Sequence, residues 1–144
     1  MTPDELAKKC AEAQWQQDPA SRALNMKIEE IRAGFAVFSM TITDKMVNGH
    51  GICHGGYIFT LADSTFAFAC NSHNQRMVAA QCEISYLAPA SLGDELVATA
   101  KERVRQERSS ITDVTVKKRD GTLIAEFRGH GRTVKGVLLP EHAA

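Results

Sequence analysis

The sequence predicts an α+β fold in which a long, buried central helix is wrapped by a curved antiparallel sheet. Residues 56–72 (GYIFTLADSTFAFACNS) carry apolar side chains in many directions around a helix, and a helix that is apolar all round is buried. Predicted strands with short links lie on both sides of this segment, and short links indicate antiparallel pairing. A chain of 144 residues suits one domain, so we expect residues 1–144 to form a single layered domain.

An N-terminal helical segment is expected over residues 1–24. Thr2 and Glu5 have the spacing of a capping box, and the proline that follows Thr2 fits the first helical position. This first helix is expected to end near Gln16. An Asp-Pro pair then indicates a second, shorter helical piece over residues 18–24.

Six segments have the character of strands. Residues 26–33 and 35–43 alternate polar and apolar side chains on either side of Gly34, which predicts a hairpin. Asp120-Gly121 is a strong signal for a tight hairpin turn later in the chain. The strands expected after the central helix are 77–88, 95–106, 109–118 and 122–134. Residues 135–144 are expected to form a loose tail.

Composition excludes several classes of protein. Lys plus Arg equals Asp plus Glu, 17 each, and a dedicated nucleic-acid binder would normally have a basic surplus. No apolar run approaches the ~18 residues of a membrane span. The polar start MTPDELAKKC does not resemble an export signal, and the four cysteines form no C-x-x-C pair. We therefore expect a cytoplasmic protein with reduced thiols and no nucleic-acid or membrane partner.

The stretch NGHGICHGG, residues 48–56, is the first candidate for chemistry. Gly55 and Gly56 lie where this loop enters the central helix, and their backbone can approach a ligand closely. The first N–H groups of a helix are unpaired and stabilise negative charge, such as the oxyanion formed when an acyl group is transferred. On the glycines alone, a plain loop with tight turns is the favoured interpretation.

Asp63 is the second candidate, because it is the only carboxylate between Asp44 and Glu83 and lies within the apolar helix. An ionised carboxylate there is unfavourable unless it is paired or faces a cleft. Burial would raise its pKa toward the range of a useful general base. The alternative is a structural aspartate that bonds nearby Ser or Thr hydroxyls; together with the glycine loop, the catalytic interpretation is favoured.

Other residues of the loop have several possible roles. His54 could orient the substrate or fix the loop, and Asn48 could hold an attacking water or simply stabilise a turn. His50, Cys53 and His54 do not have the spacing of a structural zinc site, so no metal is expected. Cys53 beside His54 is a weak signal for a thiol nucleophile. The glycine pattern resembles a dinucleotide-binding loop, but no parallel βαβ unit follows it.

The separation of the two candidates predicts a dimer. Gly55 and Asp63 are about 12 Å apart along a helix that rises ~1.5 Å per residue, too far for one reacting acyl group to touch both. Two antiparallel copies of the helix would bring Gly55 of one protomer near Asp63 of the other. We therefore expect active sites that are shared across a twofold homodimer.

These motifs resemble a known family. The run NGHGICHGG, with LAD placing Asp63 nine residues after His54, is similar to the phenylacetate-degradation (PaaI) branch of hotdog-fold thioesterases. The resemblance extends through FAFACNS and CEISYLAPASLGDELVATA to FRGHGRTV, and it covers most of residues 25–134. The combined motif is specific, whereas a short H-G-G would not be.

The resemblance implies a fold and an activity. It implies a hotdog fold and an acyl-CoA thioesterase for aryl-acyl thioesters of coenzyme A, such as phenylacetyl-CoA or hydroxyphenylacetyl-CoA, in phenylacetate catabolism. Asp63 matches the family's catalytic carboxylate, as general base or nucleophile, and the Gly55 N–H matches the oxyanion donor. His54 and Asn48 match positions that line the reacting centre. The resemblance also implies homodimers that assemble into homotetramers, with no metal or organic cofactor.

Related aryl-CoA thioesterases carry a threonine one turn beyond the carboxylate, whereas Ala67 lies there in this chain. Ser64 and Thr65, beside Asp63, are alternative sources of a hydroxyl. The phosphates of coenzyme A need cations, but most basic residues near the C-terminal strands are expected to form a solvated face. These residues are Arg103, Arg105, Arg108, Arg128, Arg132 and Lys135.

Alternative functions remain open from the sequence. A hotdog hydratase or dehydratase usually needs a catalytic His with an acidic residue just before it. Here His54 precedes Asp63 by nine residues and lies before the helix, so this function fits poorly. A non-catalytic acyl-CoA-binding module would gain nothing from Asp63 inside an apolar helix. A medium-chain acyl-CoA thioesterase is also compatible, because the apolar residues near Phe59 and Phe66 are equally good core residues and acyl-pocket residues.

Overall fold

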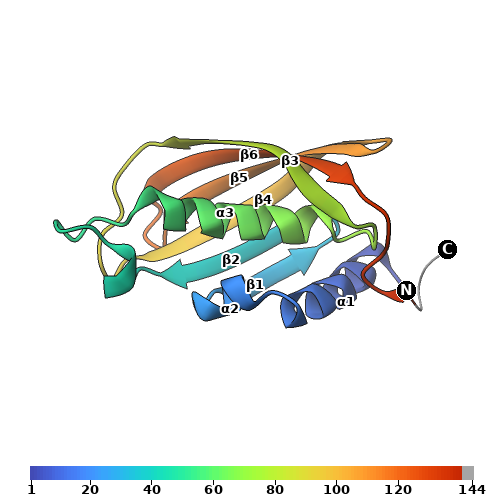
Figure 1. Ribbon diagram of the computed structural model, residues 1–144, viewed down its shortest axis with the longest axis horizontal. Coiled ribbons are helices and arrows are strands. Elements are labelled where there is room, and N and C mark those ends of the chain that lie inside the picture. Colours follow the sequence, from blue (N-terminus) through green and yellow to red (C-terminus); the bar gives the residue numbers. More distant parts are fainter. Residues whose placement is uncertain (141–144) are drawn as a thin grey trace.

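The computed structural model describes residues 1–140. Its N-terminal segment forms helix α1 (Pro3–Gln16) and helix α2 (Pro19–Ala23), as the sequence predicts. Thr2 caps α1 by accepting the Glu5 N–H at 3.1 Å. Both helices lie beside the outermost strand β1 (Lys27–Arg32), and α1 packs against it (Figure 1). No helix of the described chain is long and apolar enough to span a membrane.

The central helix α3 (Gly55–Cys70) lies across one face of the sheet (Figure 1). Half of its residues are buried, on several sides of the helix: Ile58, Leu61, Ala62, Thr65, Phe66, Phe68, Ala69 and Cys70. Its partly exposed residues include Phe59, Asp63 and Ala67, which are spaced by four and therefore form one stripe along the helix. We call this partly exposed row the open stripe of α3, although the Phe59 ring within it contacts the Phe127 ring of β6, with centroids 5.4 Å apart.

One antiparallel sheet of six strands surrounds this helix in the order β1-β2-β4-β5-β6-β3. The remaining strands are β2 (Phe35–Thr41), β3 (Met77–Tyr86), β4 (Glu95–Gln106), β5 (Ser109–Lys118) and β6 (Leu123–Thr133). A long helix wrapped by such a sheet is the hotdog fold. A short η1 turn (Asp44–Met46) precedes the glycine loop.

One expectation about the sheet is wrong. Short links predict that sequential strands pair, but β3 pairs with β6 and not with its successor β4. Residues 87–94 carry the chain away from the edge of the sheet toward its centre, and they are held against the glycine loop, where the Cys53 N–H donates to the Ala90 carbonyl at 2.7 Å. Because of this crossing, β3 is left as a free edge beside α3.

The C-terminal segment also differs from the expected loose tail. The side chain of Asn74 donates to the Leu139 carbonyl at 3.1 Å and accepts the N–H groups of Leu138 and Leu139. These bonds attach residues 138 and 139 to the turn between α3 and β3. Residues 141–144 lie outside the described part of the chain.

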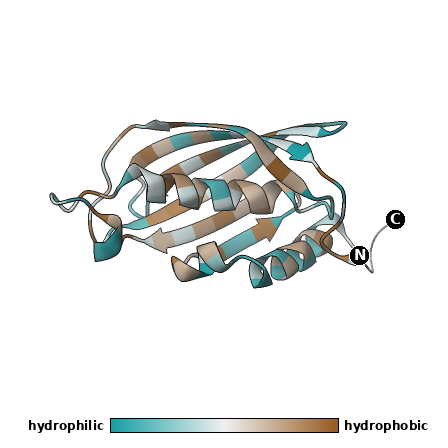
Figure 2. Cartoon of the chain, in the orientation of Figure 1, coloured by the Kyte–Doolittle hydropathy of each residue, from teal (hydrophilic) through white to brown (hydrophobic). Residues whose placement is uncertain are grey.

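Small residues let α3 approach the sheet closely. The inner face of β4 contributes Leu96, Ala98 and Ala100, which are all fully buried. Hydrophobic and hydrophilic residues alternate along the strands (Figure 2). On β6, Gly129 faces the ring of Phe66, and a Cβ at this position would lie 2.6 Å from Phe66 Cδ1. The absence of a side chain at residue 129 is therefore needed for the packing of Phe66.

We expect Gly129→Ala to lower the free energy of unfolding by about 1–3 kcal/mol, because either the ring or the strand must move. Gly49→Ala is the matched control, since a Cβ at Gly49 has no neighbour within 4 Å. Urea unfolding of both variants measures the effect. Equal stability of the two variants would contradict this account of the packing.

Candidate active site

The start of α3 presents a free backbone donor. Gly55 is the first helical residue, and within residues 1–140 its N–H has no hydrogen-bond acceptor. His54 is the N-cap, and its Nδ1 accepts the N–H of Gly56 at 3.1 Å. Accepting this bond leaves the proton of a neutral His54 on Nε2. The helix start therefore offers the Gly55 N–H, and the exposed His54 can offer a second donor.

The glycine loop is shaped by Asn48. Its Oδ1 accepts the N–H of His50 at 2.9 Å and the N–H of Ile52 at 3.2 Å. The backbone of Asn48 closes the same turn by bonding the Ile52 carbonyl at 2.9 Å. Through these contacts Asn48 stabilises the turn, which is one of the two roles that the sequence left open. The Asn48 amide nitrogen has no hydrogen-bond partner among the described residues.

Asp63 is partly buried on the open stripe of α3, with no hydrogen bond or ion pair to another described residue. Burial raises the pKa of the Asp63 carboxyl above its usual range, and the negative charge of Asp18 raises it further. A carboxylate that is poorly solvated and unpaired is a stronger base than one on the surface. The electrostatics of Asp63 are those of a candidate general base.

The two hydroxyls beside Asp63 are already engaged. Thr65 is fully buried and donates to the Leu61 carbonyl at 2.7 Å, so it faces the core. Ser64 Oγ lies 2.8 Å from Ser21 Oγ of helix α2. Thr65 therefore has no access to a substrate, and the hydroxyl of Ser64 is tied to the N-terminal segment.

Tyr86 contacts the start of α3, and the sequence reasoning missed this contact. Its hydroxyl donates to the Gly55 carbonyl at 2.8 Å, and half of the residue is exposed at the end of β3. Together with Gly55 it lines a cavity of about 420 Å³. The other lining residues are mainly apolar: Ile52, Cys53, Ile58, Leu87, Ala88, Pro89 and Ala90. The position of Tyr86 at the helix start could be predicted only if it were known that β3 runs alongside α3.

The cysteine beside His54 does not have the properties of a nucleophile. Burial raises the pKa of the Cys53 thiol to about 11, so it is protonated near neutral pH. Its Sγ is directed to the His54 carbonyl, at 3.4 Å, and not to the His54 ring. Among residues 1–140, no three His, Cys, Asp or Glu side chains are grouped so that they could hold a metal ion.

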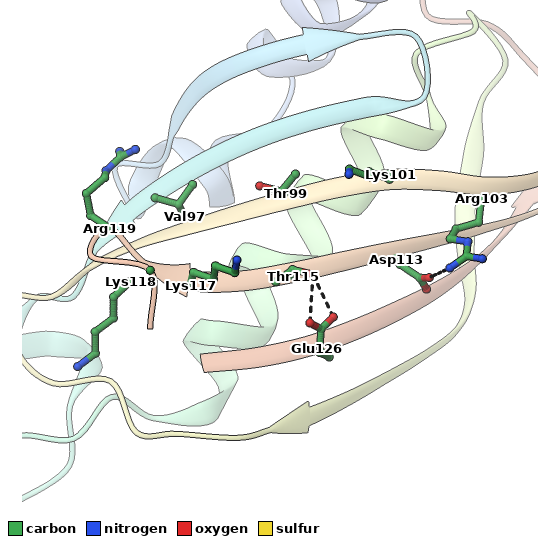
Figure 3. A pocket seen from close by; sticks show the side chains of 11 residues that line it. Val97, Thr99, Lys101, Arg103, Asp113, Thr115, Lys117, Lys118, Arg119 and Glu126 are labelled. Atoms are coloured by element: carbon green, nitrogen blue, oxygen red, sulfur yellow. Dashed lines mark hydrogen bonds and ion pairs between the residues drawn. The ribbon is translucent and has the colours of Figure 1, made fainter. Parts of the chain in front are cut away.

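A separate cavity of about 590 Å³ lies on the outer face of the sheet, away from α3 (Figure 3). Among the side chains that line it, Arg103 pairs with Asp113 and Thr115 bonds Glu126. Arg128, from outside the cavity, also pairs with Asp113. On the other side of the sheet, Arg105 bonds Glu102 and the Cys70 carbonyl. Three of the six candidate cations for phosphate are thus already in ion pairs.

The fold and this site together define a hotdog-fold thioesterase. Residues 50–125 match the family described as the thioesterase superfamily, and the chain belongs to that superfamily. The chain is a thioester hydrolase.

The chain is similar to the acyl-coenzyme A thioesterase PaaI of Escherichia coli, with 39% identity over 91% of this chain and 94% of that protein. The solved structure of the Escherichia coli PaaI protein from the phenylacetic acid degradation operon superposes with a TM-score of 0.93, at 38% identity over 94% of this chain and 99% of that one. A Streptococcus mutans protein solved with acetyl-CoA superposes with a TM-score of 0.75, at 26% identity over 78% and 91% of the two chains. The chain thus belongs to the PaaI family, as its motifs predict.

Proposed function

We propose that this protein hydrolyses aryl-acyl thioesters of coenzyme A, such as phenylacetyl-CoA or hydroxyphenylacetyl-CoA, in phenylacetate catabolism. The similarity to a PaaI thioesterase over nearly the whole chain supports this substrate class. The apolar lining of the cavity beside Gly55 is compatible with an aromatic acyl group.

The proposal rests on one observation. Helix α3 carries both a carboxylate and a backbone N–H that have no hydrogen-bond partner among the described residues. Asp63 has no partner among the described residues and a raised pKa, and the Gly55 N–H has no acceptor there. Groups left without partners inside a fold are unfavourable for stability, so their retention points to function. A carboxylate that accepts a proton and an N–H that stabilises an oxyanion are the two groups needed for thioester hydrolysis.

In the proposed mechanism, the thioester carbonyl oxygen accepts the Gly55 N–H at the start of α3. Asp63 takes a proton from a water molecule while the water oxygen attacks the carbonyl carbon. The tetrahedral intermediate collapses, the carbon–sulfur bond breaks, and Asp63 returns the proton to the departing thiolate. His54, through Nε2–H, and Asn48, through its amide nitrogen, are proposed to line the reacting centre.

The active site is proposed to be shared between two protomers. Gly55 and Asp63 lie about 12 Å apart along α3. Both are near the free edge strand, because Tyr86 of β3 donates a hydrogen bond to the Gly55 carbonyl and the charge of Asp63 raises the pKa of Cys82 on β3. A long edge strand such as β3 is a template for pairing with another chain, and Val78 and Leu87 expose apolar surface along it. Antiparallel pairing of two β3 strands would place two α3 helices antiparallel, with Gly55 of one beside Asp63 of the other.

Mixing two inactive variants tests this arrangement. In a dimer formed from one Gly55→Pro chain and one Asp63→Asn chain, one site carries both defects and the other site carries none. After unfolding and refolding together at equal amounts, we expect about a quarter of the wild-type activity, because half of the dimers are mixed and each has one intact site of two. A mixture no more active than its components would show that each chain contains a whole site.

The substrate class is tested with a panel of thioesters. Purified protein is assayed by released thiol with phenylacetyl-CoA, hydroxyphenylacetyl-CoA and medium-chain acyl-CoA. We expect kcat/KM to be highest for the aryl thioesters. Preference for the medium-chain compounds would replace the proposed substrate, and binding without release of thiol would indicate a non-catalytic acyl-CoA module.

We further propose that the enzyme works in the cytoplasm as a dimer that pairs into a tetramer, without a metal or organic cofactor. Coenzyme A is part of the substrate. The cysteines support a reducing compartment, because all four are free thiols and three of them are buried in the core.

A further inference from the structure

A hydrogen-bonded relay connects the N-terminal segment to the helix turn that carries Asp63. Asp18 caps helix α2, and its Oδ1 accepts the Ser21 N–H at 3.0 Å. Its other oxygen, Oδ2, accepts the Ser21 hydroxyl at 2.6 Å. Ser21 Oγ also lies 2.8 Å from Ser64 Oγ, and Ser21 is 1% exposed.

The direction of the relay follows from the number of protons. Ser21 has one hydroxyl proton, and the short contact to the Asp18 carboxylate uses it. The Ser64 hydroxyl must therefore donate to Ser21 Oγ. The relay runs from Ser64 through Ser21 to Asp18, and it attaches helix α2 to the turn of α3 next to Asp63.

The same relay places a second carboxylate near Asp63. Asp18 makes no ion pair among the described residues, and the neighbouring Arg22 side chain bonds the Asp18 backbone carbonyl instead. The thiols of Cys70, on the same helix, and Cys82, on β3, also interact with Asp63. Burial raises the pKa of both thiols, so both are neutral near pH 7, whereas the negative charge of Asp18 raises the pKa of Asp63.

We propose that Asp18 and Ser21 are positioning residues of the active site, which hold the Asp63 turn through Ser64 and keep a negative charge beside the catalytic base. This inference rests on the proposed function, because it assigns a role to residues that act through Asp63. An unneutralised carboxylate beside a base makes the base harder to ionise and a better proton acceptor once it is ionised. The N-terminal helices thus contribute to catalysis as well as covering β1.

Asp18→Asn tests the charge while retaining the cap, because Asn and Asp are equally good N-cap residues. Loss of the charge lowers the pKa of Asp63. We expect the acidic limb of the kcat–pH profile for phenylacetyl-CoA to move to lower pH by about half a unit to one unit. The plateau at higher pH should fall about threefold, because the base is weaker. The ratio of variant to wild-type activity should therefore rise as the pH falls.

Ser21→Ala tests the relay while retaining the charge. We expect this variant to lower the plateau of kcat with the acidic limb unmoved, since the Asp18 carboxylate remains. Glu12→Gln is the matched control, because it removes one negative charge from an exposed residue of the same N-terminal segment. The control should keep the wild-type profile.

The outcomes separate this inference from the proposed function. Absence of phenylacetyl-CoA hydrolysis by the wild-type protein would overturn the proposed function. Full activity of Asp63→Asn would leave that function in place but would remove Asp63 from the mechanism, and the role of Asp18 and Ser21 with it. An inactive Asp63→Asn together with an unshifted profile for Asp18→Asn would overturn only the role of Asp18. Titration of the Asp63 carboxyl carbon by NMR, without substrate, should show the same downward shift in Asp18→Asn, and no shift would contradict the electrostatic coupling.

Discussion

Replacing Asp63 with Asn is expected to lower kcat by about 10²–10⁴-fold with little change in KM, since general-base catalysis contributes factors of this size. Asn has nearly the same shape as Asp but cannot take a proton from water. The apolar surroundings that bind the acyl group are unchanged, so ground-state binding should persist. Steady-state kinetics with phenylacetyl-CoA, monitored by released thiol, measures the loss.

The same substitution should stabilise the folded protein near neutral pH. The pKa of Asp63 is raised in the folded state, mainly by burial, so the folded state disfavours the ionised form relative to the unfolded chain. The contribution of Asp63 to wild-type stability is therefore fully present below its unfolded pKa of about 3.9 and is lost as the pH rises through its folded pKa. Asp63→Asn lacks this decline, and its Tm should exceed the wild-type Tm at pH 7 but not at pH 4.

An exposed aspartate provides the control for both effects. Asp44→Asn, in the η1 turn, removes a charge outside the helix and should change neither kcat nor the pH dependence of Tm. A wild-type kcat for Asp63→Asn would remove Asp63 from the mechanism. A lower Tm at pH 7 would show that the carboxylate has a stabilising partner instead of an unfavourable environment.

Most of the fold could be predicted from the sequence because its signals are local. Thr2 and Asp18 cap helices where their side chains and the following prolines indicate, and all six strands lie within about the expected bounds. The helix over residues 55–70 is recognisable because it is apolar on every side. Patterns of this kind report which face of an element is buried, but not which neighbour buries it.

The position of β3 shows the limit of such reasoning. Its pairing with β6 depends on where residues 87–94 cross, which no local signal encodes. Tyr86 at the helix start and Ser21 beside Ser64 are consequences of tertiary contacts between distant segments, so neither could be found from motif spacing. Gly55 and Asp63, by contrast, could be chosen from the sequence as candidate site residues, because an unusual residue type interrupts an otherwise uniform pattern.

Gly55→Pro should lower kcat by a further factor of about 10²–10³ relative to Gly55→Ala, the usual loss for one oxyanion donor. Proline is tolerated here for three reasons. Position 55 is the first residue of α3, His54 before it has the extended conformation that proline requires (φ −63°, ψ 133°), and the lost N–H has no acceptor within residues 1–140. The substitution therefore removes the donor without breaking the helix.

Gly55→Ala is the matched control because it adds a Cβ but keeps the N–H. In both variants the new Cβ lies 3.0 Å from Tyr86 Cζ, so the phenol ring must shift in each, and any loss from this shift cancels in the comparison. Circular dichroism should show equal helix content for the two variants. If the Gly55→Pro and Gly55→Ala variants have the same kcat, the N–H of residue 55 is not the oxyanion donor. The negative charge must then be stabilised by another group, and the Nε2–H of His54 is the nearest alternative on the helix cap.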